Sequence, residues 1–202
     1  LFTQALRSAH FLPLEQQPAV LGDAWMELGE KVRTTTLIMI RMGATQTQVA
    51  LIATGSVVQS ATINCGGADL DLACIHYLRQ AHQLSVSAPS IVALKESYTK
   101  AQYAKSVFST VVRGKHTSRS EITSVTLTEK EVSALYRHFF DELAMAITTT
   151  LVQEISYVKN SSTPIPIYLS GGLSLFSESA QSLSNCIREK IQVVSRPTVA
   201  AV

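Results

Sequence analysis

The sequence predicts an α/β fold in which a mixed sheet is flanked by helices. Three strand-like segments follow one another in residues 37–63, and helices and strands then alternate along the rest of the chain. Two glycine pairs, at 66–67 and 171–172, each stand between an apolar strand and a helix. Glycine is favoured at such junctions because the backbone must turn sharply or approach another segment closely.

The composition is that of an ordinary globular protein of 202 residues, 46% hydrophobic and 16% charged, which suffices for one large domain or two small lobes. A net charge of +2 gives no indication of a nucleic-acid or membrane partner. The basic cluster at 113–119 lacks aromatic residues and is interpreted as an exposed hairpin tip. No run of membrane-spanning length and no signal peptide is found, so we expect a cytoplasmic protein without membrane insertion. The three cysteines have no metal-ligand spacing and are expected to be free thiols in a reducing compartment.

Residues 1–36 are predicted to form a leading helix and strand, followed by a connecting segment that is helical over 19–30. The start at Leu1 instead of Met suggests a fragment. Residues 35–42 form a continuous apolar run typical of a buried central strand. Segments 47–54 and 55–63 read as a hairpin that turns at Thr54–Gly55.

A helix is predicted to begin at Gly66–Gly67, because Asp69 suits its positive N-terminal end and apolar residues recur at three- and four-residue spacing. A second helix begins near Ser90, and the alternating strand 119–128 follows it. Together they form a small helix-hairpin subdomain over about residues 90–127.

The strongest helix-start signal is the capping box Thr128–Glu131, which opens a long helix that ends at 161–164. Residues 165–170 are predicted to be a short buried strand, with the glycine pair 171–172 as its terminal turn. A closing helix over 177–191 and an extended piece at 193–197 complete the predicted fold.

The segment 37–71 resembles the second phosphate-binding segment of the actin and DnaK-type heat-shock ATPase superfamily. In that superfamily the first strand ends in Asp-hydrophobic-Gly-Gly-Gly-Thr, and a later Asp follows. Here Arg41 and Gln48 stand at the acidic positions, while Gly43 and Thr45 remain. The resemblance implies a ribonuclease-H-like, actin-type ATPase lobe over residues 37–202, the second lobe of the nucleotide-binding domain, with the other lobe of the same protein as a partner.

The DnaK-type branch is suggested by residues 100–109, which resemble a helix that ends Glu-Arg-Ala-Lys-Arg-Thr-Leu-Ser and contacts adenosine. Residues 167–177 resemble the family's Val-Leu-Val-Gly-Gly-Ser-Thr-Arg-Ile-Pro segment. Ser106 and Leu175 replace the two adenine-stacking arginines. The resemblances together imply a set of nucleotide-binding residues: Gly43, Thr45, Gly66, Gly67, Lys105, Ser109, Gly171 and Gly172.

The expected ligand is ATP or ADP, bound weakly or not at all and without a metal ion. Each lost arginine removes a cation–π contact of about 0.5–2 kcal/mol. The lost carboxylates remove the groups that organise Mg²⁺ for phosphoryl transfer, so no catalytic residue is assigned and hydrolysis is not expected. Arg41 is open to two interpretations: a direct contact to phosphate, or a partly buried, ion-paired strand end with no ligand.

Three functions remain open at this point. The first is a degenerate lobe of a heat-shock-chaperone-like nucleotide-binding domain, a pseudo-ATPase that binds a protein partner or co-chaperone; the helix at 100–109 favours it. The second is a lobe of an actin-like cytoskeletal or cell-division protein, favoured by the short segment between the second and third helices. The third is an active ATPase with an altered metal site.

Overall fold

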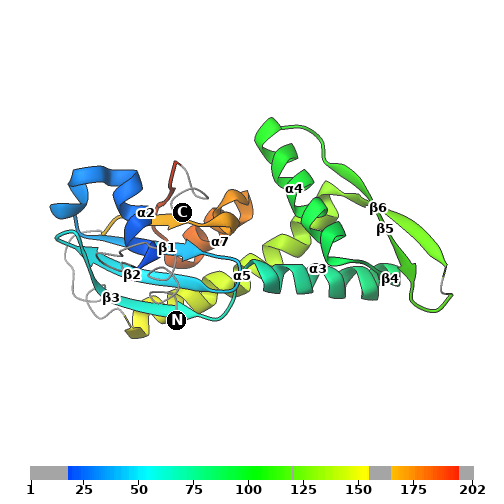
Figure 1. Ribbon diagram of the computed structural model, residues 1–202, viewed down its shortest axis with the longest axis horizontal. Coiled ribbons are helices and arrows are strands. Elements are labelled where there is room, and N and C mark those ends of the chain that lie inside the picture. The colour runs from blue at the N-terminus through cyan, green and yellow to red at the C-terminus, as the bar shows by residue number, and fades with distance from the viewer. Residues whose placement is uncertain (1–17, 120, 155–164, 196–202) are drawn as a thin grey trace, which may run out of the picture.

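The computed structural model describes residues 18–119, 121–154 and 165–195. A five-stranded sheet lies at one end of the molecule and a three-stranded sheet at the other (Figure 1). Helices α3 (Gly67–His82) and α5 (Glu129–Glu154) connect the two ends. The end with the five-stranded sheet is called the large part below, and the end with the three-stranded sheet is called the small part.

The large part contains the predicted mixed sheet, with the strand order β3-β2-β1-β7-β8. Strands β1 (Leu37–Met42), β2 (Thr47–Ala53) and β3 (Ser56–Ile63) are antiparallel neighbours. Strands β7 (Ile167–Ser170) and β8 (Ile191–Val193) continue the sheet in parallel with β1. The predicted α/β fold with a mixed sheet flanked by helices is therefore confirmed.

Strand β1 is buried on both sides, which explains its uninterrupted apolar sequence. Leu37 and Met39 belong to a core with α2 (Ala19–Leu28), which is followed by the 3₁₀ helix η1 (Gly29–Arg33). Ile38, Ile40 and Met42 belong to the other core, which includes residues of α5 and of α7 (Ser177–Ile187). The period-two alternation of β1 thus places one helical layer on each face of the sheet.

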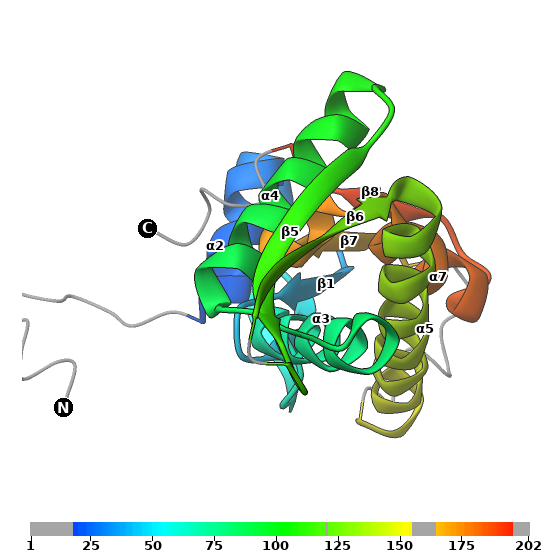
Figure 2. The same ribbon diagram turned by 90° about the vertical axis from the view of Figure 1, so that its right-hand side faces the viewer.

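The small part consists of α4 (Ala88–Ala104) and the strands β4 (Leu84–Ser85), β5 (Ser109–His116) and β6 (Ile122–Thr128). Helix α4 packs against β5, and α5 packs against β6 (Figure 2). The sequence analysis described the region after α4 only as a hairpin and missed β4. The predicted boundaries at residue 37 and at 90–127 stay predictions.

Other differences concern where elements end. Helix α5 is described as far as Glu154, so its predicted break at 161–164 lies outside the described residues, as do the leading helix and strand before residue 18. Helix α7 ends at Ile187, earlier than predicted, because Arg188 adopts a left-handed backbone with φ 60°. Strand β8 overlaps the predicted final extended piece, 193–197, only at Val193, and residues 196–197 lie outside the described residues. Cys65, Cys74 and Cys186 are all free.

A buried carboxylate joins the two parts. Glu178 of α7 is 3% exposed and accepts hydrogen bonds from Tyr98 and Gln102 of α4 and from Ser133 of α5. Burial acts to raise the pKa of Glu178, but the hydrogen bonds from Tyr98, Gln102 and Ser133 outweigh it, so the pKa lies below its usual value. Burial and the bond to this carboxylate raise the pKa of Tyr98 to about 12. A charged Glu178 therefore holds α4 against α5 and α7.

A second carboxylate, Glu131, ties α3 to α5. Its Oε1 atom accepts a hydrogen bond from the Tyr77 hydroxyl at 2.7 Å and lies 2.5 Å from Nε2 of His82.

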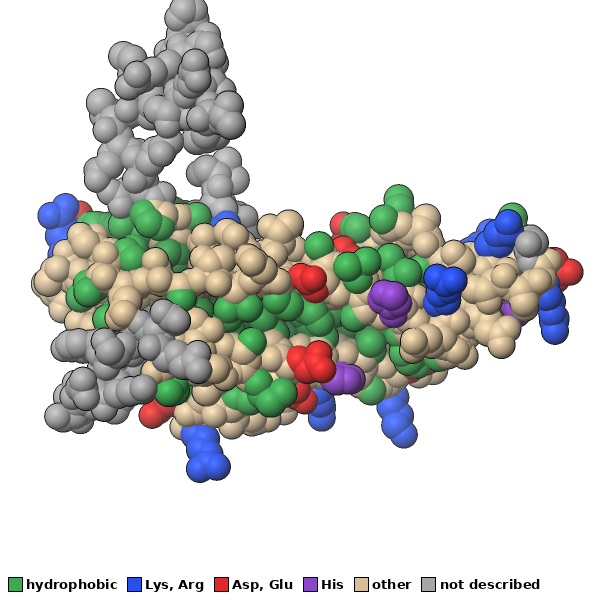
Figure 3. Space-filling model, turned by 90° about the horizontal axis from the view of Figure 1, so that it is seen from below, with side chains coloured by type: hydrophobic (Ala, Val, Ile, Leu, Met, Phe, Trp, Pro, Cys, Tyr) green, Lys and Arg blue, Asp and Glu red, His purple; other side chains and the backbone are tan. Residues whose placement is uncertain are grey.

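Figure 3 shows the molecule from below, where apolar side chains gather along the middle of the face. Within the described ranges, no helix is both long and apolar enough to span a membrane.

Candidate functional site

A cavity of about 710 Å³ lies where the large and small parts meet. The large part contributes Arg41 and the β1–β2 turn, together with the segment 171–176 that follows β7. The N-terminal turn of α3 and one face of α4 complete the lining. The cavity therefore lies at the carboxyl ends of the parallel strands β1 and β7, where open α/β sheets commonly bind ligands.

Two of the predicted glycines are required because backbone segments approach each other closely. A Cβ atom on Gly171 would lie 2.2 Å from the carbonyl oxygen of Met42, and the residue has φ +88°. A Cβ atom on Gly66 would lie 2.8 Å from the carbonyl oxygen of Ala44. Both glycines thus bring the start of a following segment against the end of β1 and its turn.

The backbone N–H groups at the start of α3 are engaged within the chain. Gly67 N–H donates to the carbonyl oxygen of Gly43 at 3.0 Å, and Ala68 N–H donates to that of Ala44 at 2.7 Å. Gly66 N–H donates to Asp69 Oδ2 at 2.8 Å. These donors would otherwise suit a phosphate at the helix N-terminus. In this conformation the N–H groups of Gly67 and Ala68 hold the β1–β2 turn, and that of Gly66 is capped by Asp69.

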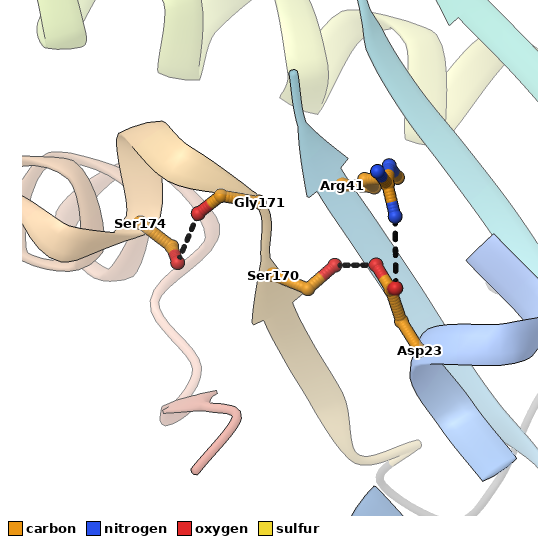
Figure 4. Close-up of polar contacts among 5 residues, drawn as sticks. All are labelled: Asp23, Arg41, Ser170, Gly171 and Ser174. Atoms are coloured by element: carbon orange, nitrogen blue, oxygen red, sulfur yellow. Dashed lines mark hydrogen bonds and ion pairs between the residues drawn. The ribbon is translucent and has the colours of Figure 1, made fainter. Parts of the chain in front are cut away.

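Arg41 is partly buried and ion-paired in β1, and whether it also contacts a phosphate stays a prediction (Figure 4). Its Nη1 atom lies 2.8 Å from Oδ1 of Asp23, and Ser170 donates a hydrogen bond to the other carboxylate oxygen. Asp23 is 1% exposed, whereas the Arg41 side chain is 18% exposed and lines the cavity. The sequence analysis missed Asp23; an acidic residue on the apolar face of α2 was the available signal.

The face of α4 that lines the cavity was also missed. Lys95, Thr99 and Tyr103 recur every four residues and lie beside Glu96 and Lys100. Lys95 Nζ is 2.5 Å from Asp71 Oδ1, and Lys100 Nζ is 3.7 Å from Glu96 Oε2. Each cation that lines the cavity therefore has a carboxylate partner.

The cavity brings together only part of the predicted nucleotide-binding set. Gly43, Gly67, Gly171 and Gly172 line it. Thr45 lies in the β1–β2 turn and Gly66 precedes α3, but neither lines the cavity. Lys105 follows the last residue of α4 with φ 50°, and Ser109 begins β5, so both lie beyond the α4 residues that line the cavity. The predicted roles of all these residues in binding stay predictions.

The donor set does not fit a divalent metal ion. Within the residues that the structure describes, no group of three or more His, Cys, Asp or Glu side chains could hold a metal. The cavity carboxylates of Asp71 and Glu96 each face a lysine, and both oxygens of Asp23 accept hydrogen bonds. Mg²⁺ prefers carboxylate, phosphate and water oxygens that are not already neutralised by a cation.

Taken together, the mixed sheet with helices on both faces and the cavity at its carboxyl edge define a lobe of the actin-like ATPase fold. Residues 24–202 match the family model described as MreB/Mbl protein, and the chain belongs to this family. No protein with a curated description matches the chain at a significant level.

Solved structures show the same fold at low sequence identity. MreB 5 of Spiroplasma citri bound to AMPPNP has a TM-score of 0.84 at 13% identity, covering 99% of this chain and 60% of that chain. Its structure bound to ADP has a TM-score of 0.81 at 14% identity, covering 99% and 61%. The ethanolamine utilization protein EutJ from Carboxydothermus hydrogenoformans has a TM-score of 0.66 at 14% identity, covering 98% and 57%. The chain thus spans about three fifths of the length of these relatives.

The family match corrects one prediction. The prediction of a DnaK-type heat-shock chaperone is wrong, because the matched family is MreB/Mbl, whereas the broader actin-like superfamily is confirmed. One of the resemblances behind the chaperone prediction takes residues 100–109 as part of one helix. In the structure α4 ends at Ala104, so Ser106 and Ser109 do not belong to it.

Proposed function

We propose that this chain is a lobe of an actin-like cytoskeletal protein that assembles with further copies of itself and binds an adenine nucleotide in the cavity described above. The observation that supports this proposal most directly is the position of that cavity. It lies at the carboxyl ends of β1 and β7 and between the two parts of an MreB/Mbl-family lobe. The other lobe of the same protein is the second partner, and the proposed location is cytoplasmic.

The lining supports a nucleotide because it includes both apolar side chains and glycine backbone. Tyr103, Leu175 and Phe176 offer apolar and aromatic surface suited to a base. Gly43, Gly171 and Gly172 offer backbone that a ligand can approach closely. The related Spiroplasma protein was solved with AMPPNP and with ADP, which favours this class of ligand. Hydrolysis is not part of the proposal, because Arg41 and Gln48 stand at the acidic positions.

The test is to assemble the full-length protein with ATP, with ADP and without nucleotide. Assembly is measured by sedimentation and by negative-stain electron microscopy. Filaments that pellet at a defined critical concentration are expected. Binding of a fluorescent adenine nucleotide is measured on the same samples. A protein that binds nucleotide but stays monomeric at all concentrations would contradict the cytoskeletal role and leave the cavity assignment standing.

A further inference from the structure

We infer that the cavity binds a nucleoside di- or triphosphate without a divalent cation, and that the guanidinium of Arg41 serves as the cation that a metal ion would otherwise supply. This inference rests on the proposed function, since it concerns the ligand of the same cavity. It predicts a property of binding, independence from Mg²⁺, that can be measured apart from assembly.

The first argument is the state of the carboxylates around the cavity. Asp71 is ion-paired with Lys95, and Glu96 lies near Lys100. Asp23 is buried, with one oxygen bonded to Arg41 and the other to Ser170. A metal ion that bound Asp23 would have to displace Arg41 or Ser170, and one that bound Asp71 would compete with Lys95 for the same carboxylate. The cavity therefore favours an anion that brings no metal with it.

The second argument is the hydrogen-bonding capacity of Arg41. A guanidinium carries five N–H donors in one plane, and two of them can donate parallel hydrogen bonds to the oxygens of one phosphate. Among the described residues, the contact to Asp23 is the single side-chain hydrogen bond that Arg41 makes. Because the side chain also lines the cavity beside Gly43 and Gly171, donors remain available for a phosphate while Asp23 stays bound.

The charge of Asp23 allows the inference to be tested by the direction in which the affinity for a phosphate changes. Its negative charge lies 2.8 Å from the Arg41 nitrogen and opposes the approach of an anion to the cavity. Removing that charge while keeping Arg41 should strengthen binding of a phosphate. A purely structural role for the ion pair predicts the opposite, since Asp23→Asn would then only loosen the site.

The experiment is calorimetric titration of the full-length protein with ATP, ADP and adenosine, in MgCl₂ and in EDTA. For wild type we expect ATP and ADP affinities that agree within about twofold in the two buffers, and weaker binding of adenosine. Asp23→Asn should raise ATP affinity by about threefold to tenfold. The double variant Asp23→Asn/Arg41→Gln should lower it by about tenfold relative to wild type, because a charge-assisted hydrogen bond is lost.

In the single variant Arg41→Gln the buried Asp23 charge would lose its partner, and the protein would be destabilised. The double variant removes both charges and avoids this effect. Glu121→Gln, which removes one negative charge as Asp23→Asn does but at an exposed position outside the cavity, is the matched control for the change in net charge and should leave affinity unchanged. Nucleotide binding that requires Mg²⁺, or ATP affinity that is the same in the double variant and in wild type, would overturn the inference. Absence of nucleotide binding in every buffer would overturn it too, while assembly without nucleotide would leave the cytoskeletal role in place.

Discussion

At the scale of single residues, two adjacent glycines of the cavity have different reasons to be present. Gly171 has φ +88°, and a Cβ atom added there would lie 2.2 Å from the Met42 carbonyl oxygen. A Cβ atom added at Gly172 would have no neighbouring atom within 4 Å. We expect Gly171→Ala to lower the free energy of unfolding by about 3 kcal/mol, through backbone strain and displacement of β1. Gly172→Ala, the matched control, should change it by less than about 1 kcal/mol. Urea denaturation of both variants measures this, and equal effects would contradict the packing described here.

Glu178 provides a prediction of pH dependence. Its pKa lies below the usual 4.5, so its charged form stabilises the fold above that pH, and this stability is lost as the pH falls through the pKa of the folded state. Glu178→Gln should lower the free energy of unfolding by about 1–3 kcal/mol at pH 7, because hydrogen bonds to a charged group are lost. It should also flatten the decline in stability below about pH 4.5.

The control for this measurement is Glu121→Gln, which neutralises an exposed glutamate. Denaturant titrations from pH 3 to pH 7 should give the control the pH profile of wild type. A Glu178→Gln profile that runs parallel to wild type across the whole range would show that Glu178 is not held in its charged form.

At the scale of elements, the N-terminus of α3 is fixed by a side chain and by the β1–β2 turn. Asp69 Oδ2 accepts the hydrogen bond from Gly66 N–H at 2.8 Å. Asp69→Ala should lower the free energy of unfolding by about 1 kcal/mol, as loss of a helix cap does. Asp69→Asn keeps an acceptor oxygen and should lose less than half of that. Thermal unfolding followed by circular dichroism distinguishes the two variants, and an Asp69→Ala variant as stable as wild type would contradict the capping role.

The elements that the sequence predicted well are those with strong periodicity. The apolar sequences of β1 and β2 and the apolar faces of α3 and α5 match their burial, and the Thr128–Glu131 signal correctly marks the start of α5. Strands β4 and β8 have two and three residues, too few for a periodic pattern. Glu131 illustrates the limit, because its contacts with Tyr77 and His82 join α5 to residues about fifty positions away.

The candidate site was predictable only where backbone geometry determines residue type. Gly171 lines the cavity and has no room for a side chain, because its Cβ position lies 2.2 Å from the Met42 carbonyl oxygen, whereas Gly67 and Gly172 line it without that constraint. Lys95, Thr99 and Tyr103 were missed because their role depends on how α4 lies against the large part, which no local pattern records. Asp23 was missed for the same reason, since its partners Arg41 and Ser170 come from two different strands.

At the scale of the whole molecule, the cavity is shared by the two parts, which meet through α3, α5 and the Glu178 contacts. The large part contributes the segment 171–176, and the small part contributes one face of α4. A ligand that fills the cavity would contact both parts at once and resist their separation. Ligand binding and the motion of the small part should therefore be coupled.

Hydrogen exchange measures this coupling directly. We expect saturating ATP to slow amide exchange in both α4 and residues 171–176 of the full-length protein, by about tenfold or more where opening of the cavity limits exchange. The β2–β3 turn at Thr54–Gly55, which does not line the cavity, serves as an internal control and should exchange at the same rate with and without ATP. Slowing confined to residues 171–176 would mean that the ligand contacts the large part alone, and the assignment of the α4 face to the site would then be wrong.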